Sequence, residues 1–261
     1  MIGAIIGDIV GSRFEFNNTN KTNFSLFTND CDFTDDTICT VAVADAILHG
    51  ASFEDKLREW CHKYPNPKGA YGGSFGAWLN SANPQPYNSF GNGAAMRVSP
   101  CAFAAESDAE AIRLAIASAS CTHNHPEGII GAAATALVIR ALACDFGEPR
   151  LTARVNAETV ISTYYGDDWY KHLPAPGVFD VTCQGCVPLA FYIVDNSSCF
   201  EVAIREAVAY GGDSDTLAAI VGSMAEVLFG IPVDLIESAL AYLPEEMRVI
   251  IKEFYDKYQA L

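Results

Sequence analysis

The chain has 261 residues, of which 50% are hydrophobic and only 18% are charged. This length and composition exclude a disordered chain and predict a globular protein with a sizeable core, which we expect to be a single domain over residues 1–261. The formal charge of −16 excludes the basic face that characterises nucleic-acid-binding proteins. An anionic ligand can still bind where cations or helix N-termini supply local positive charge.

Cysteine usage and the first residues predict a reduced, cytoplasmic compartment. The nine cysteines follow no regular spacing, and the N-terminal apolar run has no basic residue before it and is interrupted by Asp8. One CxxC pair, Cys183 and Cys186, lacks a partner pair and is better explained as buried thiols than as a metal or redox site. The long apolar stretches are interrupted by charged residues such as Arg140 and Glu226, so we expect no membrane span.

Apolar residues recur at helical spacing along almost the whole chain, and no segment shows the alternation of a β-hairpin. The pattern predicts an all-α protein, an orthogonal multi-helix bundle. The glycine-rich segments 71–78 and 89–97 are each expected to lead into a short helix, and Ser52 is expected to cap a helix that ends near residue 64. The other expected helices cover residues 1–16, 34–49, 108–120, 127–144, 152–164, 181–194, 198–210, 213–229, 232–240 and 245–258.

The first expected helix carries glycine at every fourth position. Gly3, Gly7 and Gly11 share one face, so another backbone can pack closely against it. Glu15 lies two turns beyond Asp8 on a similar face. It is either a solvated residue at the helix end or a carboxylate that points into a site.

Two acidic clusters each open an apolar helix. The first contains Thr34, Asp35 and Asp36, and the second contains Asp213, Asp215 and Thr216. At each helix start, capping and the helix dipole explain one of the two aspartates, but they do not explain the other. If both clusters and Glu15 converge, each pair of like charges about 4 Å apart costs about 4 kcal/mol at an effective dielectric constant near 20. Such a pocket needs protons or cations, and its oxygen ligands suit two Mg²⁺ or Mn²⁺ ions better than Zn²⁺.

Two further segments are candidates for ligand binding. Glycines just before a helix, in the segment of Ser89, Phe90, Gly91, Asn92 and Gly93, let backbone N–H groups approach an anion.

His123 and His125 lie in a loop between two expected helices. They are structural residues, donors to phosphate or ribose oxygens, or, least favoured, zinc ligands.

These motifs together resemble the ADP-ribosylglycohydrolase family, and in particular the dinitrogenase-reductase-activating glycohydrolases. Each motif alone is weak, but five of them occur in the family's order and span nearly the whole chain. The matching pieces are residues 3–8 with Glu15, residues 33–37, residues 91–97, residues 122–126 and residues 211–216.

The resemblance implies an all-α domain with two Mg²⁺ or Mn²⁺ ions in a central cleft. It also implies a metal-dependent hydrolase that removes ADP-ribose from an ADP-ribosylated protein, most often from arginine, or from a small ADP-ribosyl compound. Ser89 to Gly93 would hold the diphosphate, with Phe90 against the adenosine, and His123 would assist the phosphates or the ribose. The implied metal ligands are Thr34, Asp35, Asp36, Asp213, Asp215 and Thr216. Glu15 would be a ligand or a gate near the scissile bond, and either Glu15 or Asp36 would handle the proton.

One departure from the family pattern affects the choice of acid. Some relatives carry an acidic residue shortly before the Gly-Asn-Gly element, where this chain has Asn88 and Ser89. This shifts the expected acid to Glu15 and the aspartate clusters. Two alternatives remain: a catalytically silent ADP-ribose-binding or crystallin-like relative, and a dimetal phosphoesterase that cleaves the pyrophosphate.

Overall fold

The computed structural model describes residues 1–143 and 150–258. Within these ranges the chain forms fourteen α-helices and one 3₁₀ turn, with no β-strand, so the predicted all-α class is confirmed. None of the helices in the described part is long and apolar enough to cross a membrane.

A central antiparallel pair of helices, α1 (Ile2–Gly11) and α12 (Ser214–Phe229), organises the fold. The two backbones approach closely because the facing residues are small. A Cβ atom added at Gly7 would collide with the carbonyl group of Ala218, and one added at Gly11 would lie 2.5 Å from the Cα of Asp215. The C-terminal end of α1 is therefore fixed beside the first turn of α12.

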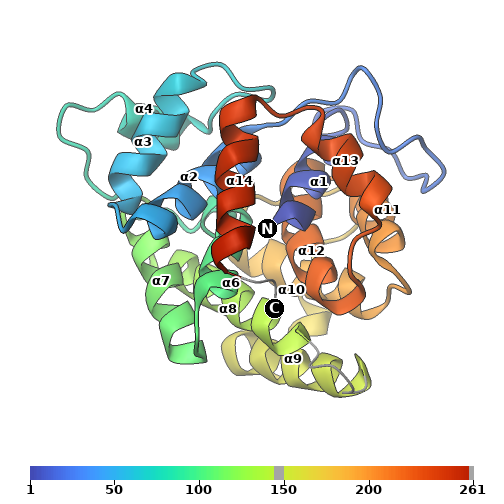
Figure 1. Cartoon of the computed structure of the whole chain (residues 1–261). Coiled ribbons are helices and arrows are strands. Elements are labelled where there is room, and N and C mark those ends of the chain that lie inside the picture. Colours follow the sequence, from blue (N-terminus) through green and yellow to red (C-terminus); the bar gives the residue numbers. More distant parts are fainter. Residues whose placement is uncertain (144–149, 259–261) are drawn as a thin grey trace.

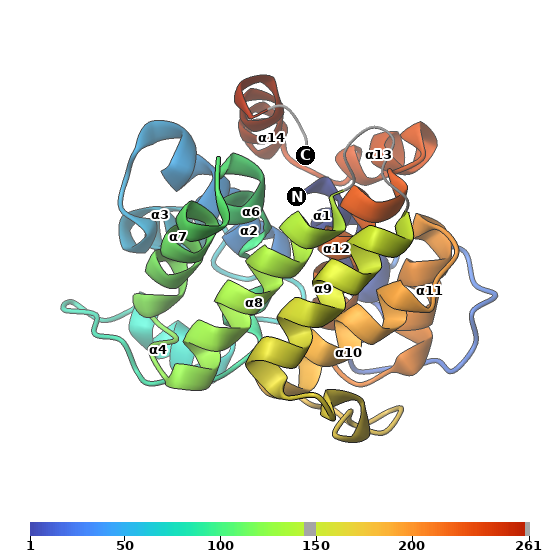
Figure 2. The same cartoon turned by 90° about the horizontal axis from the view of Figure 1, so that it is seen from below.

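The remaining helices surround this pair (Figures 1 and 2). On one side α2 (Asp35–His49) packs against α3 (Phe53–Lys63) and α14 (Glu245–Lys257). The helices α7 (Asp108–Ser120), α8 (Pro126–Leu142) and α9 (Arg150–Tyr165) follow one another as neighbours, and α9 reaches α10 (Cys183–Asp195). On the other side α10 and α11 (Phe200–Tyr210) pack against α12. The short elements are α4 (Gly73–Leu79), α5 (Gly93–Met96), α6 (Ser99–Ala104), the 3₁₀ turn η1 (Trp169–Lys171) and α13 (Val233–Leu240).

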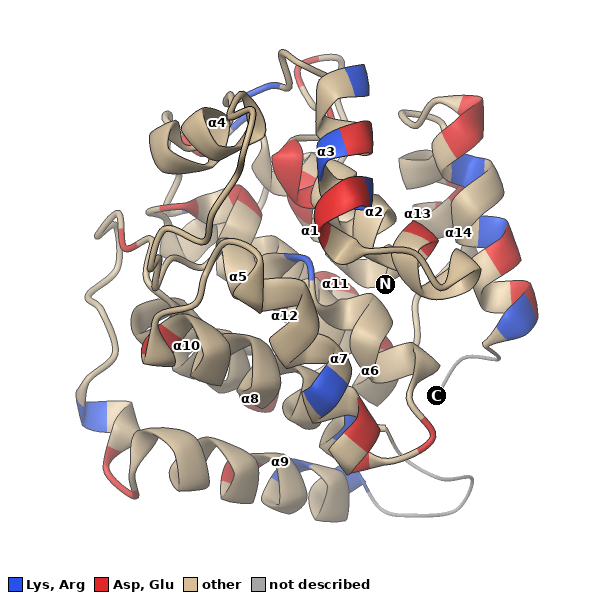
Figure 3. Ribbon diagram, turned by 90° about the vertical axis from the view of Figure 1, so that its left-hand side faces the viewer, with Lys and Arg blue, Asp and Glu red and all other residues tan. Residues whose placement is uncertain are grey.

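Charged residues lie mainly on the outer helices. Figure 3 shows acidic and basic positions interspersed on α3 and α14. Ser52 caps α3 as expected, because its side chain accepts a hydrogen bond from the backbone N–H of Asp55. The apolar faces of the same helices, among them Leu57 of α3 and Phe254 of α14, are buried in the core.

The structure corrects the prediction for the first helix, which ends at Gly11 and not near residue 16. Asn18 explains the change of direction. Its side chain accepts a hydrogen bond from the N–H of Gly212 at 2.8 Å and donates one to the Gly212 carbonyl at 2.9 Å, so the chain turns back toward the start of α12.

The helix expected at the glycine-rich segment 89–97 consists of two short helices, α5 and α6. The 3₁₀ turn η1 is not predicted, because three residues carry too little periodicity. Cys144, the predicted end of the helix that forms α8, lies outside the described residues.

Candidate metal centre and substrate cleft

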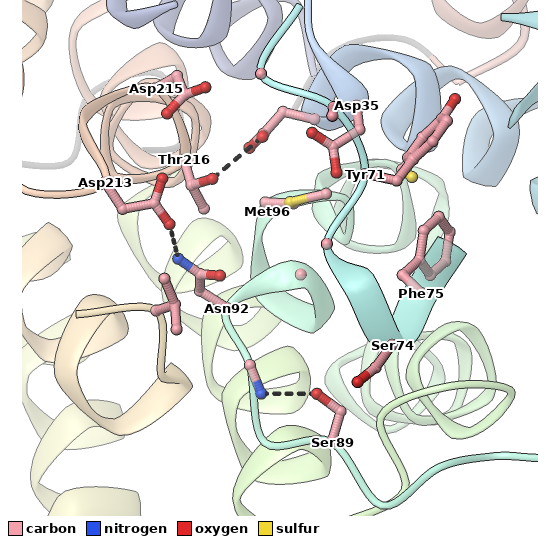
Figure 4. Close-up of a pocket in the computed structure, with 18 of the residues that line it drawn as sticks. Asp35, Tyr71, Ser74, Phe75, Ser89, Asn92, Met96, Asp213, Asp215 and Thr216 are labelled. Carbon is pink, nitrogen blue, oxygen red and sulfur yellow. Dashed lines mark hydrogen bonds between the residues drawn. The ribbon is translucent and has the colours of Figure 1, made fainter. Parts of the chain in front are cut away.

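The two acidic helix starts meet at the centre of the molecule. Thr216, in the first turn of α12, donates a hydrogen bond from its hydroxyl to Oδ2 of Asp36 at 3.1 Å, although the two residues are 180 positions apart. Carboxylate oxygens of Asp8, Asp36 and Asp215 lie within 4.8 Å of one another, as do those of Glu15, Asp213 and Asp215. Figure 4 shows the α12 residues facing Asp35 of α2 across the pocket.

Asp8 connects the start of α2 to α1. Its carboxylate accepts hydrogen bonds from the N–H and hydroxyl of Thr34, at 3.0 and 2.7 Å, and from the N–H and hydroxyl of Thr37. It satisfies N–H groups in the first turn of α2 that have no partner within that helix. Thr34 itself caps α2, since its hydroxyl oxygen accepts from the N–H of Asp36 at 3.2 Å. These bonds fix Asp35 and Asp36 relative to α1.

Burial and mutual repulsion make the ionised cluster costly. The pKa of Asp35 is raised to about 8, first by burial and then by the charges of Asp8 and Asp213. Burial likewise raises the pKa of Asp8 to about 6, against the opposing effect of its four hydrogen bonds. The pKa values of Asp36 and Asp215 are also raised, first by burial and then by the neighbouring carboxylates.

The cluster has the donor atoms that a hard divalent cation requires. Oδ1 of Asp36 and Oδ1 of Asp215 are both shielded from solvent and have no hydrogen-bond partner within the described residues. A buried carboxylate oxygen without a partner is costly, and a cation would remove that cost. Ligand atoms here are carboxylate and hydroxyl oxygens, which fit Mg²⁺ or Mn²⁺.

Glu15 lies in the turn after α1, half-buried at the edge of the cluster. Burial raises its pKa to about 7, and the charges of Asp213 and Asp8 contribute to the rise. Gly69 leaves room for this side chain, because a Cβ atom there would lie 2.5 Å from Oε2 of Glu15. Of the two interpretations of Glu15, the structure agrees with a carboxylate that points into the site.

A cleft of about 470 Å³ opens over the cluster. The acidic residues line one end, and Ser89, Gly91, Asn92, Gly93 and His123 line another part. Asn92 joins the two regions because its amide donates to Oδ2 of Asp213 at 2.6 Å (Figure 4).

The start of α10 holds the loop of residues 89–93 in place. The N–H of Asn92 donates to the Val181 carbonyl at 2.7 Å, and the N–H of Cys183 donates to the Phe90 carbonyl at 2.9 Å. The Cys183 thiol donates a hydrogen bond to the Gly91 carbonyl at 3.0 Å, and the Cys186 thiol donates one to the Asp180 carbonyl at 3.2 Å. The CxxC pair is therefore accounted for as buried thiols that pack against this loop.

Two of the predicted ligand-binding residues lie beside the cleft and are not among the residues that line it. Phe90 is 44% exposed and its ring lies 5.2 Å from that of His125. His125 also has a structural role, since its Nδ1 accepts from the N–H of Glu127 and caps α8. Phe90 is thus available at the rim, whereas the position of His125 is explained by capping.

Several residues at the site carry little or no signal in the sequence. For Asp8, which holds the start of α2, the only local signal is an isolated charge in an apolar run. Arg97 and Thr122 contact each other behind His123. Phe16 and Phe179 stack at the mouth of the cleft, with ring centroids 6.0 Å apart, and have no local signal in the sequence.

Similarity to known proteins extends over nearly the whole chain. The family model described as ADP-ribosylglycohydrolase matches residues 1–260. Among solved structures, one described as an ADP-ribosylglycohydrolase-related protein complex is similar, with a TM-score of 0.72 and 20% sequence identity over 99% of this chain and 97% of that chain. At that identity the likeness shows a shared fold. No curated protein matches the sequence.

Proposed function

Because this chain belongs to the ADP-ribosylglycohydrolase family, we propose that it is a metal-dependent hydrolase that cleaves the glycosidic bond between ADP-ribose and an acceptor. Among the acceptors of this family we favour an arginine guanidinium. The observation that carries the proposal is the meeting of Asp36 and Asp215 in the floor of the cleft, where each has a shielded oxygen without a partner among the described residues.

The residues at the two helix starts fit a pair of Mg²⁺ or Mn²⁺ ions. Their ligands would come from Asp35, Asp36, Asp213, Asp215 and Thr216, with a remaining lone pair of Thr34 as a further donor. When bound, such ions would supply Lewis-acid stabilisation of the ribose hydroxyls and a water of lowered pKa. Asp8 already receives four hydrogen bonds, so its role is to hold the start of α2.

Proton transfer is assigned to Glu15 and Asp36. Glu15 is half-buried and borders the cleft, where its carboxylate can exchange a proton with the substrate or a water. Asp36 lies deeper, against Thr216, where it can accept a proton from an attacking water. Two carboxyl groups on either side of a glycosidic bond are the usual arrangement for its hydrolysis.

The two ends of the substrate would occupy different parts of the cleft. The loop of Ser89, Gly91 and Gly93 would hold the diphosphate, with His123 beside it and Phe90 against the adenosine at the rim. The acceptor would leave past the stacked rings of Phe16 and Phe179, which are 75% and 48% exposed. Phe16 directly follows Glu15 in the chain. A planar guanidinium stacks well on such rings.

The direct test is incubation with ADP-ribosylarginine and Mg²⁺ or Mn²⁺, with the products separated by chromatography. We expect free ADP-ribose and arginine as the products, and Asp215→Asn should abolish their release. Glu253→Gln removes the same charge from an exposed position on α14 and should leave the rate unchanged.

A panel with serine-linked and small-molecule ADP-ribosyl compounds then identifies the linkage. No turnover on any linkage by metal-loaded protein would contradict the proposal. Tight ADP-ribose binding without turnover would favour a silent binding protein, and AMP among the products would favour a phosphoesterase.

A further inference from the structure

Behind the cleft, a buried row of three side chains runs from Arg97 through Thr122 to His123. Nη2 of Arg97 donates to the hydroxyl oxygen of Thr122 at 2.7 Å, and that oxygen lies 2.7 Å from Nδ1 of His123. Exposure is 1% for Arg97, 0% for Thr122 and 6% for His123, so water does not compete for these bonds.

Arg97 determines the direction of the row. A guanidinium group can only donate, and Nη2 of Arg97 also donates to the Ser118 carbonyl at 2.9 Å, which fixes its orientation. Thr122 must therefore accept from Arg97, and its single hydroxyl proton is free to go to another acceptor.

The hydroxyl of Thr122 has two acceptors within reach. The Ala119 carbonyl lies 3.4 Å away and already accepts the backbone N–H groups of Thr122 and His123, at 3.0 and 2.7 Å. Nδ1 of His123 is much closer, at 2.7 Å. The proton consequently points at Nδ1, which must be unprotonated to receive it.

We propose that Arg97 and Thr122 are positioning residues that hold His123 as a neutral imidazole with its proton on Nε2, so that it serves as a fixed hydrogen-bond donor to the phosphate oxygens of ADP-ribose. The inference rests on the proposed function. Within the part of the chain that the structure describes, Nε2 makes no hydrogen bond. It faces the loop, 3.1 Å from the position of a Cβ atom at Gly93 and 3.5 Å from one at Gly91.

The surroundings of His123 also oppose a second proton. The pKa of His123 is lowered to about 3, first by burial and then by the charge of Arg97. The ring is therefore neutral at pH 7 and does not act as an acid, which leaves proton transfer to the carboxylates.

The tautomer can be read directly from the ¹⁵N chemical shifts of the wild-type protein labelled with [¹⁵N]histidine, with the His123 signals assigned from a His123→Gln variant. At pH 7 we expect an unprotonated Nδ1 and a protonated Nε2. A proton on Nδ1, or on both nitrogens, would overturn the proposal. This measurement needs no substrate and no folded variant other than the one used for assignment.

Thr122→Val removes the hydroxyl at nearly constant volume, and Thr122→Ser is the matched control that keeps it. The loss of one oriented donor should raise the Kd for ADP-ribose and the KM for the ADP-ribosyl substrate about three- to tenfold, with kcat changed less than about twofold. Thr122→Val should also populate both tautomers, whereas Thr122→Ser should restore the wild-type shifts and constants.

An unchanged tautomer and an unchanged Kd in Thr122→Val would overturn the proposal. If wild-type protein neither binds nor hydrolyses any ADP-ribosyl compound, the proposed function fails, and with it the assignment of phosphate as the partner of Nε2. The shifts would still decide the tautomer.

Discussion

The acidic cluster predicts that the metal-free protein loses stability as the pH rises from 5 to 8. Asp8, Glu15 and Asp35 have pKa values of about 6, 7 and 8 in the folded protein. The ordinary values of these side chains, which apply in the unfolded chain, are 3.8, 4.5 and 3.8. The folded state therefore holds more protons than the unfolded state across this range. Their contribution to stability is present at low pH and lost as the pH rises through the folded-state pKa values.

Asp8 alone gives the scale of the effect. Its pKa rises from 3.8 to about 6 in a fully buried group, so within the measured range its contribution is lost mainly between pH 5 and about 6, which corresponds to about 1.4 kcal/mol for one pH unit. For a chain of this size 1 kcal/mol changes Tm by about 2–4 °C, so Asp8 contributes a fall of about 3–6 °C. The neighbouring carboxylates extend the fall toward pH 8.

Thermal unfolding of EDTA-treated protein, followed by circular dichroism between pH 5 and 8, measures this effect. Saturating Mn²⁺ should abolish most of the fall, because bound cations stabilise the ionised carboxylates. Asp35→Asn should flatten the curve, whereas the exposed control Glu253→Gln should leave its slope unchanged. A Tm that stays constant or rises from pH 5 to 8 in EDTA would refute the electrostatic account of the cluster.

Three further predictions concern the scaffold and the cleft. Gly7→Val should lower the free energy of unfolding by about 3 kcal/mol in denaturant titrations, because its side chain would collide with the Ala218 carbonyl group; Gly76→Ala, which meets nothing within 4 Å, is the control and should cost nothing. Asn92→Ala should reduce kcat/KM for the ADP-ribosyl substrate about ten- to a hundredfold, because it removes the hydrogen bond to Asp213, and an unchanged value would exclude this role. Phe16→Ala should raise the KM for ADP-ribosylarginine about three- to tenfold without changing the Kd for free ADP-ribose; equal weakening of both would place the ring against ADP-ribose and not the acceptor.

The features that the sequence predicts well are local. The start of α2 is recognisable because Thr34 caps the helix through the N–H of Asp36, only two residues away. The start of α3 is recognisable in the same way from Ser52 and the N–H of Asp55. The glycine spacing of the first helix correctly predicts close packing of another backbone, although it does not identify α12 as the partner.

The features that the sequence does not predict depend on contacts between distant segments. The role of Asp8 requires the start of α2 to lie beside α1, 26 residues away in the chain. The end of the first helix depends on Asn18 and Gly212, 194 positions apart.

The ring pair of Phe16 and Phe179 similarly exists only after both loops meet at the mouth of the cleft. Local capping and periodicity contain no information about such pairs, so they appear only in the folded structure.

The most direct test of the central claim is a calorimetric titration of metal-free protein with Mn²⁺ at pH 7.5. We expect saturable binding of two ions per chain, weakened by Asp36→Asn at the start of α2 and equally by Asp215→Asn at the start of α12, because both helices contribute ligands to one centre. Absence of saturable binding, or binding that neither substitution changes, would contradict it.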